Sequence, residues 1–288
     1  MPRSRHHPLL SLALACGLLP AALAQSRPSP EAETLYRKGL GLMQSGQLAE
    51  AQAVLEETLR LSPTYPAAEL TLANTLRKLK KCDQAVSHYE AVLKAQPDEA
   101  LAHGNLGYCL SMLGRQTDAI QHLERASQLR PEEVQWHTML GALYRQGKQY
   151  ERALPHLEKA AQLDPRNPDV LRSLAIGFRQ LKQMDRAIEV TQRAIQLQPN
   201  DSNLRFDLGV LFRLQQRDAE ALAAYGESIR MDARNAEPWF DIGVILARGG
   251  RRPEAIDAFN HYLAIVGDRR PAQAEGVRKI IKDLREKP

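Results

Sequence analysis

The feature that most constrains this chain is a strict 34-residue period. Alanine returns at that interval without exception, at Ala51, Ala85, Ala119, Ala153, Ala187, Ala221 and Ala255. Proline returns at the same interval, at Pro63, Pro97, Pro131, Pro165 and Pro199. A fixed period of this size is typical of arrays in which each repeat packs mainly on its neighbours. The period therefore predicts a stack of repeats rather than a globule with one central core.

A second column indicates what each repeat contains. One position is always very small, at Gly39, Ala73, Gly107, Gly141, Ala175, Gly209 and Gly243. Glycine and alanine allow two backbones to approach closely, so this column predicts the crossing point of two amphipathic helices. The proline column marks the end of the second helix, because proline cannot continue a helix. One such hairpin cannot bury its own apolar face, so the hairpins must stack.

These columns resemble the tetratricopeptide repeat. The fourth repeat carries Leu140, Gly141, Tyr144, Ala153, Leu157, Ala160 and Pro165, and the seventh carries Trp239, Gly243, Ala255 and Phe259. The resemblance implies an all-α fold, a right-handed α-solenoid of helix-turn-helix repeats. It covers residues 32–269, and its register places the seven repeats at 32–65, 66–99, 100–133, 134–167, 168–201, 202–235 and 236–269.

The two ends of the chain differ from the repeats. Residues 1–24 combine Arg3 and Arg5 with an apolar run, LLSLALACGLLPAAL, and the small-residue pattern Ala-Leu-Ala before Gln25. This predicts a signal peptide and export to the periplasm or the outside, with a retained anchor as the alternative. Residues 25–31 are expected to be a flexible leader. At the other end, Val277, Ile280, Ile281 and Leu284 form one helix stripe, which predicts a capping helix within residues 270–288.

No catalytic motif and no cofactor-binding motif are found in the sequence. The histidines are regular, with His88, His122 and His156 one period apart and His103 and His137 likewise. Residues one period apart lie on equivalent helices of successive repeats, roughly 10 Å or more apart by helix packing distances. Ligands of a zinc ion lie about 2.1 Å from the metal. The regularity therefore indicates a partly exposed position copied by duplication, and no metal site is predicted.

Two cysteines remain beyond the signal segment. Cys82 is expected at the start of the second helix of repeat two, and Cys109 near the end of the first helix of repeat three. These helices are expected to be antiparallel neighbours, and an exported protein can keep a disulfide. A Cys82–Cys109 bridge and two buried thiols are both compatible with the sequence.

The resemblance also implies a concave groove lined by the first helix of each repeat. Its predicted residues are Arg77, Tyr108, Arg145, Arg172, Arg179, Phe206, Arg213, Phe240 and Arg248. Four of the arginines share one repeat position, and arginine binds carboxylates through two parallel hydrogen bonds. The competing explanation is structural, because a cation in the last turn of a helix is favoured by the helix dipole.

We therefore expect a non-catalytic scaffold that binds a peptide or protein segment, acidic in character, during assembly of an envelope complex. The alternative is an accessory subunit of a periplasmic enzyme or of a polysaccharide or secretion complex. Nucleic acid is not an expected partner, because the net charge of +5 is small and export of the chain is predicted. No stable membrane span is expected after signal cleavage.

Overall fold

The computed structural model describes residues 27–286, and within them it contains fifteen α-helices, one short 3₁₀ turn and no strand. The predicted signal segment, residues 1–24, lies outside the described residues. The chain divides into two compact bodies, Met1–Ala95 and Gln96–Pro288, called here the N-terminal and C-terminal bodies. The predicted all-α solenoid is confirmed, because the helices follow one another in packed pairs.

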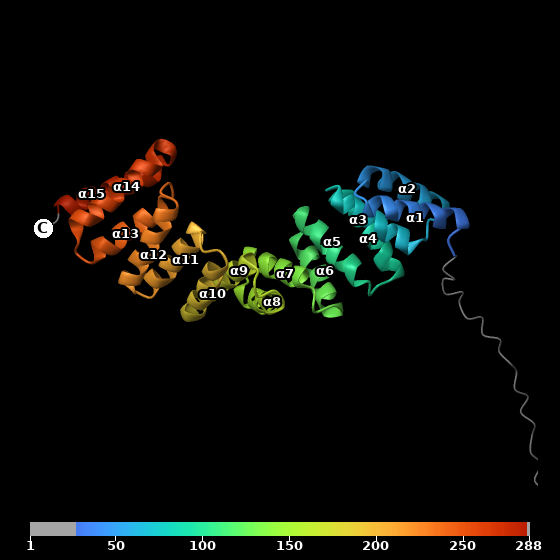
Figure 1. Ribbon diagram of the computed structural model, residues 1–288, viewed down its shortest axis with the longest axis horizontal. Coiled ribbons are helices and arrows are strands. Elements are labelled where there is room, and N and C mark those ends of the chain that lie inside the picture. The colour runs from blue at the N-terminus through green and yellow to red at the C-terminus, as the bar shows by residue number, and fades with distance from the viewer. Residues whose placement is uncertain (1–26, 287–288) are drawn as a thin grey trace, which may run out of the picture. The chain divides into compact units, whose positions relative to one another are not determined.

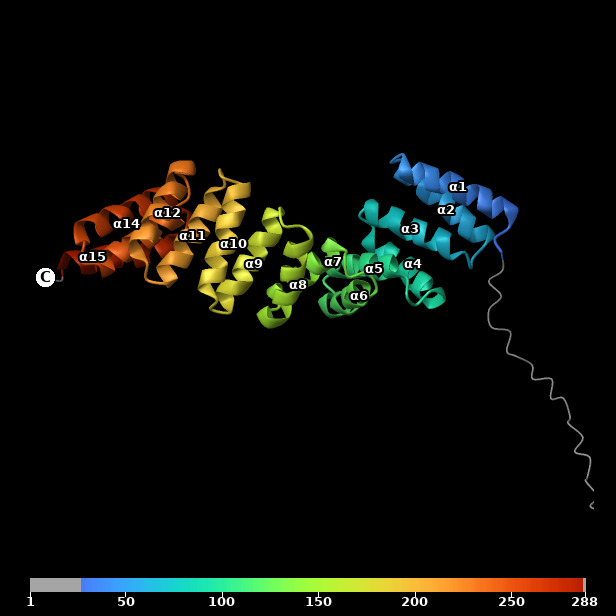
Figure 2. The same cartoon turned by 60° about the horizontal axis from the view of Figure 1, so that its bottom comes forward.

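Each predicted repeat contains two helices. In the N-terminal body these are α1 (Pro30–Gln44), α2 (Leu48–Leu61), α3 (Pro66–Lys78) and α4 (Cys82–Ala95). In the C-terminal body they are α5 (Ala100–Met112), α6 (Gln116–Leu129), α7 (Val134–Gln146), α8 (Tyr150–Leu163), α9 (Pro168–Gln180), α10 (Met184–Leu197), α11 (Ser202–Leu214), α12 (Asp218–Met231), α13 (Glu237–Arg248) and α14 (Arg252–Val266). Figures 1 and 2 show the helices of the C-terminal body stacked in chain order.

Helix α1 begins inside the segment that the sequence assigned to the leader. Pro30 is its first residue, and the side chain of Ser29 accepts a hydrogen bond from the backbone N–H of Ala32. Serine is a favoured N-cap and proline is favoured at the first helical position, so this helix start is locally encoded. The predicted leader at 25–31 therefore extends too far.

The predicted capping helix corresponds to α15 (Pro271–Glu286). Val277 and Ile281 are buried against α14, and Leu284 packs on the same cluster. Ile280 was expected in this buried stripe, but 36% of it is exposed. Its side chain instead borders an open hollow beside Phe240. The buried stripe is therefore narrower than the sequence pattern indicated.

The small-residue column lies where the two helices of a repeat cross. A Cβ atom at Gly141 would lie 2.4 Å from Cδ2 of Leu157, and one at Gly209 would lie 2.5 Å from the ring of Tyr225. Real Cβ atoms do not approach other carbons this closely, so the crossing distance requires glycine at these positions.

The turn inside every repeat contains one residue with positive φ. These residues are Gly46, Lys80, Gly114, Lys148, Lys182, Gln216 and Gly250, at intervals of 34. The following N–H bonds back to a carbonyl five residues earlier, as in Gln149 to Tyr144, which is the Schellman ending of a helix. In repeat four Lys148 adopts this conformation and Gly147 does not. This column of positive-φ residues was not predicted from the sequence, because four of its seven members are not glycine.

Candidate binding face

The predicted groove residues of the C-terminal body lie on the first helices of its repeats, α5, α7, α9, α11 and α13. We call their shared surface the A-helix face. Helix α7 contacts α9, and α11 contacts α13, so residues of successive repeats can meet across this face. Tyr108 is half-buried on α5. Arg77 lies on α3 of the N-terminal body and is considered apart from this face.

Arg172 is held by the chain's own acids. Its guanidinium lies 3.0 Å from Oδ2 of Asp201 and 3.7 Å from Oδ2 of Asp207. Burial raises the pKa of Asp207, and the positive charges of Arg172 and Arg179 oppose that rise. The hollow lined by these residues between α9 and α11 measures only about 10 Å³. The guanidinium of Arg172 is therefore occupied by internal pairing.

Arg213 is engaged in the same way one repeat later. Its Nε lies 3.5 Å from Oδ1 of Asp241 and 3.4 Å from the hydroxyl of Tyr225. That hydroxyl also donates to Oδ2 of Asp241 over 2.9 Å. Burial raises the pKa of Asp241, while the tyrosine hydrogen bond and Arg213 oppose the rise. Arg248 pairs instead with Asp218 at the start of α12.

Arg145 and Arg179 differ from the other arginines of the face. Within residues 27–286, no ion pair joins either of them to a carboxylate. The Nε atom of Arg145 is buried and, like Nε of Arg172, has no hydrogen-bond partner in the described part of the chain, so the difference between the two arginines lies in the ion pairs of Arg172. Asp241 follows Arg213 by 28 residues, and the residue that follows Arg145 by 28 is Ser173. Arg145 therefore faces a repeat without the matching acid.

Asp207 and Asp241 belong to this face and were not predicted from the sequence. Asp207 and Asp241 occupy one repeat position, and each follows an arginine of the column by 28 residues. That spacing could have been recognised in the sequence, because it connects the last turn of the first helix in one repeat with the first helix of the following repeat. The arginines were predicted to face a partner, and the structure places internal acids beside Arg172, Arg213 and Arg248.

The predicted aromatic residues line the same helices. Phe206 packs on Tyr225 with ring centres 5.7 Å apart, and Phe240 packs on Tyr262 at 5.5 Å. Phe240 and Tyr262 also border a hollow of about 320 Å³ with Val277 of α15. Phe206 and Phe240 therefore contribute both to the packing of their repeats and to the surface.

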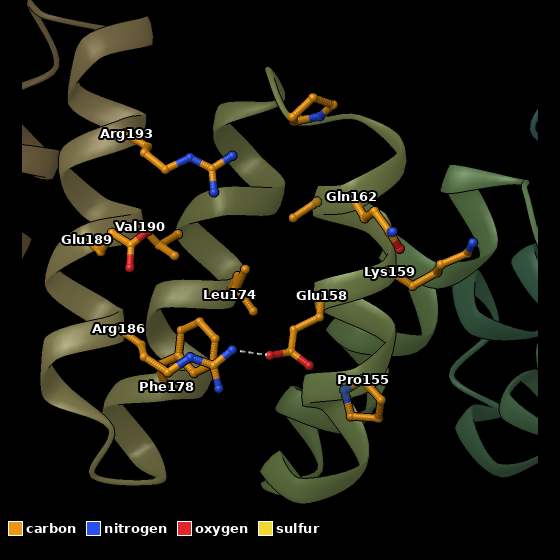
Figure 3. A pocket seen from close by; sticks show the side chains of 12 residues that line it. Pro155, Glu158, Lys159, Gln162, Leu174, Phe178, Arg186, Glu189, Val190 and Arg193 are labelled. Atoms are coloured by element: carbon orange, nitrogen blue, oxygen red, sulfur yellow. Dashed lines mark hydrogen bonds and ion pairs between the residues drawn. The ribbon is translucent and has the colours of Figure 1, made fainter.

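A larger open hollow, of about 650 Å³, lies between the second helices α8 and α10 (Figure 3). Leu174 and Phe178 of α9 line it. Arg186 lies over the ring of Phe178 at 4.1 Å and pairs with Glu158 at 2.5 Å. The other charged residues that line the hollow carry both signs, so the hollow has no strong preference for a charged ligand.

The regular histidines pair inside a repeat rather than between repeats. Nδ1 of His103 lies 2.9 Å from Nδ1 of His122, and Nδ1 of His137 lies 3.1 Å from Nδ1 of His156. Partners are 19 residues apart, on the two antiparallel helices of one hairpin. The predicted partly exposed position is confirmed for His88, His103, His122 and His156, whereas His137 is buried. The pairing at a spacing of 19 residues was not predicted, because this spacing is not the repeat period.

These pairs predict a pH-dependent loss of stability. Burial and, second, the partner imidazole lower the pKa of His122 and of His156 in the folded chain. The unfolded chain then binds protons more readily, so their contribution is complete above about pH 6.5 and is lost below it. Two charged residues act on each of these histidines, and each carboxylate raises the histidine pKa whereas each guanidinium lowers it. They are Asp118 and Arg115 at His122, and Glu124 and Arg152 at His156. The urea concentration at the unfolding midpoint is expected to decrease when the pH is lowered from 7 to 5.

The His122→Gln/His156→Gln variant provides the control. Its urea midpoint should fall less than that of the natural chain over the same pH interval. Protonation of Asp207 and Asp241 acts in the opposite direction, because their pKa values are raised. An equal fall in both proteins would show that the imidazole pairs do not control the acid response.

Both cysteines are buried, Cys82 in the N-terminal body and Cys109 in the C-terminal body. Because they belong to different bodies, the bridge between them stays a prediction. None of the described helices has the length and apolar character that a membrane span requires.

Comparison with known families assigns the repeat. Two models described as tetratricopeptide repeat match the chain, one at residues 70–134 and 206–274, the other at 42–86 and 144–211. Together they match more than half of the sequence. The chain belongs to the tetratricopeptide repeat (TPR) family. TPR proteins generally mediate protein–protein interactions. No curated protein sequence matches the chain.

Solved structures agree with this TPR fold. The C-terminal part of a TPR protein from Cytophaga hutchinsonii has a TM-score of 0.68 at 18% identity, covering 84% of this chain and 98% of that one. YrrB, described as a TPR protein with an unusual peptide-binding site, has a TM-score of 0.58 at 22% identity, covering 66% and 97%. PilF of Pseudomonas aeruginosa has a TM-score of 0.57 at 22% identity, covering 72% and 95%. At these identities the likeness concerns the fold.

Proposed function

We propose that this TPR protein is an exported, non-catalytic scaffold for assembly of an envelope complex. It binds an acidic peptide or protein segment on the A-helix face of repeats four and five. The observation that carries the proposal is the position of Arg145 and Arg179, which have no ion-paired carboxylate within residues 27–286, whereas Arg172, Arg213 and Arg248 do.

Electrostatics supports this division of the face. Arg213 and Asp241 have opposite charges, so their pair attracts an acidic ligand weakly. Asp207 is shared between Arg172 and Arg179, and Arg145 has only Ser173 at the matching position. Positive charge thus remains in excess on α7 and α9. Arginine at such a place offers two parallel hydrogen bonds to one carboxylate. The peptide-binding site named for YrrB gives a precedent for peptide binding by this fold.

The direct test measures peptide binding to the untagged chain. Fluorescent peptides of one length, either rich in Glu and Asp, neutral, or rich in Lys, are compared by anisotropy at two salt concentrations. The acidic peptide should bind best, and its affinity should fall with salt. Arg145→Ser/Arg179→Ser should weaken it by about tenfold or more per arginine, since a hydrogen bond to a charged group contributes about 1.5–3 kcal/mol.

A matched control removes the same charge elsewhere. Arg193→Ser/Arg230→Ser also lowers the net charge by two, from exposed positions on the second helices α10 and α12. It should bind the acidic peptide as the natural chain does. Equal weakening in both double variants would indicate general charge attraction, and unchanged binding in the first would exclude Arg145 and Arg179 as the site.

A further inference from the structure

The two histidine pairs hold their rings in a defined protonation state. Nε2 of His103 lies 2.9 Å from the carbonyl oxygen of Pro97, and Nε2 of His137 lies 3.0 Å from that of Pro131. A carbonyl oxygen only accepts, so Nε2 carries the hydrogen. In the neutral ring Nδ1 then presents a lone pair to the second histidine. A backbone carbonyl fixes metal-binding histidines in the same manner.

Two lone pairs that face each other repel, so a hydrogen or a cation must lie between the two Nδ1 atoms. In the metal-free pair this is the hydrogen on Nδ1 of His122 or His156. A metal ion bonded to both Nδ1 atoms would replace this hydrogen and lie to one side of the line that joins them. With bonds of about 2.0–2.1 Å, two nitrogens at a right angle lie about 2.8–3.0 Å apart, and at a tetrahedral angle about 3.3–3.4 Å. The pairs measure 2.9 and 3.1 Å, closer to the right angle.

We infer that each pair is a two-nitrogen chelate for a divalent transition-metal ion, Cu²⁺ in preference to Ni²⁺ and Zn²⁺. A right angle between ligands suits the square-planar or tetragonal coordination of Cu²⁺ and Ni²⁺, and Cu²⁺ binds nitrogen ligands most tightly of the three. On binding, the hydrogen of His122 or His156 moves from Nδ1 to Nε2, and both Nδ1 lone pairs bond the metal. The neutral pair releases no proton in this step.

The surroundings rank the two sites. His103 and His122 are both half-buried, and the carboxylate of Asp118 acts on His122 from one turn earlier in α6. His137 is only 7% exposed. The first pair should therefore bind the metal more readily. In the described part of the chain, no three side chains from His, Cys, Asp and Glu gather as a metal site. Water must complete the coordination, so these sites are exchangeable.

The test uses the untagged chain and copper chloride at pH 7.5. Isothermal titration should find two more copper ions bound by the natural chain than by His122→Gln/His156→Gln. His122→Gln alone should remove the tighter of the two. The electron paramagnetic resonance spectrum should show two coordinating nitrogens per copper in the natural chain. Gln keeps a donor and an acceptor at the ring position, and circular dichroism verifies that the variants fold.

Control variants and competing metals make the result decisive. His261→Gln removes an exposed histidine that stacks on Trp239 outside the pairs, so copper binding should stay unchanged. Ni²⁺ and Zn²⁺ should bind the same sites more weakly. If the double variant binds as much copper as the natural chain, or if the spectrum shows one nitrogen, the chelate assignment is wrong. If the variants unfold, the nitrogen count in the natural chain decides alone.

Discussion

Gly209→Ala is expected to lower the unfolding free energy of the C-terminal body by about 1–2 kcal/mol. Overpacking a tight core typically costs about 1–3 kcal/mol, and the higher helix propensity of alanine offsets up to about 1 kcal/mol of that cost. The added Cβ would lie 2.5 Å from the ring of Tyr225, which is fully buried. The ring cannot move outward without breaking the hydrogen bond from its hydroxyl to Asp241 in the next repeat. Urea unfolding followed by circular dichroism measures the loss.

Gly226→Ala is the matched control in the same repeat. It makes the same chemical change one residue after Tyr225, at a helical position where a Cβ meets no atom within 4 Å. Alanine favours a helix over glycine by about 1 kcal/mol, so this variant should be slightly more stable than the natural chain. Equal effects of the two substitutions would contradict the assignment of Gly209 to a steric contact.

Arg213→Ser is expected to destabilise the C-terminal body by roughly 2 kcal/mol, because it leaves Asp241 ionised and largely buried. Removing one partner of a fully buried pair costs about 3–5 kcal/mol. The lower figure applies because Arg213 keeps 29% of its side chain exposed. Since the folded pKa of Asp241 is raised, the stability of this variant should increase as pH falls toward that pKa.

Asp241→Asn completes a double-mutant cycle. Burial already disfavours the charge on Asp241, so its removal should cost less than about 1 kcal/mol, within the range of an ordinary hydrogen bond. The double variant Arg213→Ser/Asp241→Asn should then be more stable than the sum of the single effects predicts. Additive effects would mean that the two residues do not interact across the repeat interface.

The sequence predicted the repeat, the helix pairs and the capping helix because each depends on a pattern that recurs at one spacing. Gly209 could be placed at a helix crossing, since a small residue recurs every 34 positions for one steric reason. The turn at Lys148 could not, because a left-handed residue is recognisable in a sequence mainly when it is glycine. Ile280 shows a further limit, since helical spacing places a residue near the buried stripe without fixing its exposure.

The contacts of the candidate face were harder to predict. The partner of Arg213 lies 28 residues away and the partner of His103 lies 19 away. Neither distance is the repeat period, and both depend on how two helices are offset along their axes. A column of arginines therefore looked uniform in the sequence, although Arg145 and Arg213 face different neighbours. The deciding information is the geometry between helices, which a single repeat position does not contain.

The spacing of 28 residues between arginine and aspartate has a consequence for the evolution of this array. Unequal recombination in the gene can delete one whole repeat while keeping the reading frame of helices and turns. Loss of residues 168–201 would place Arg145 28 positions before Asp207, whereas loss of the next repeat would place Arg179 28 positions before Asp241. In the first shortened chain both Arg145 and Arg213 are followed by an aspartate at this spacing, whereas in the second Arg145 is still followed by Ser173. Copy number can therefore change how many arginines of the column lack a following aspartate, and under the proposed function it would also change the affinity for an acidic ligand.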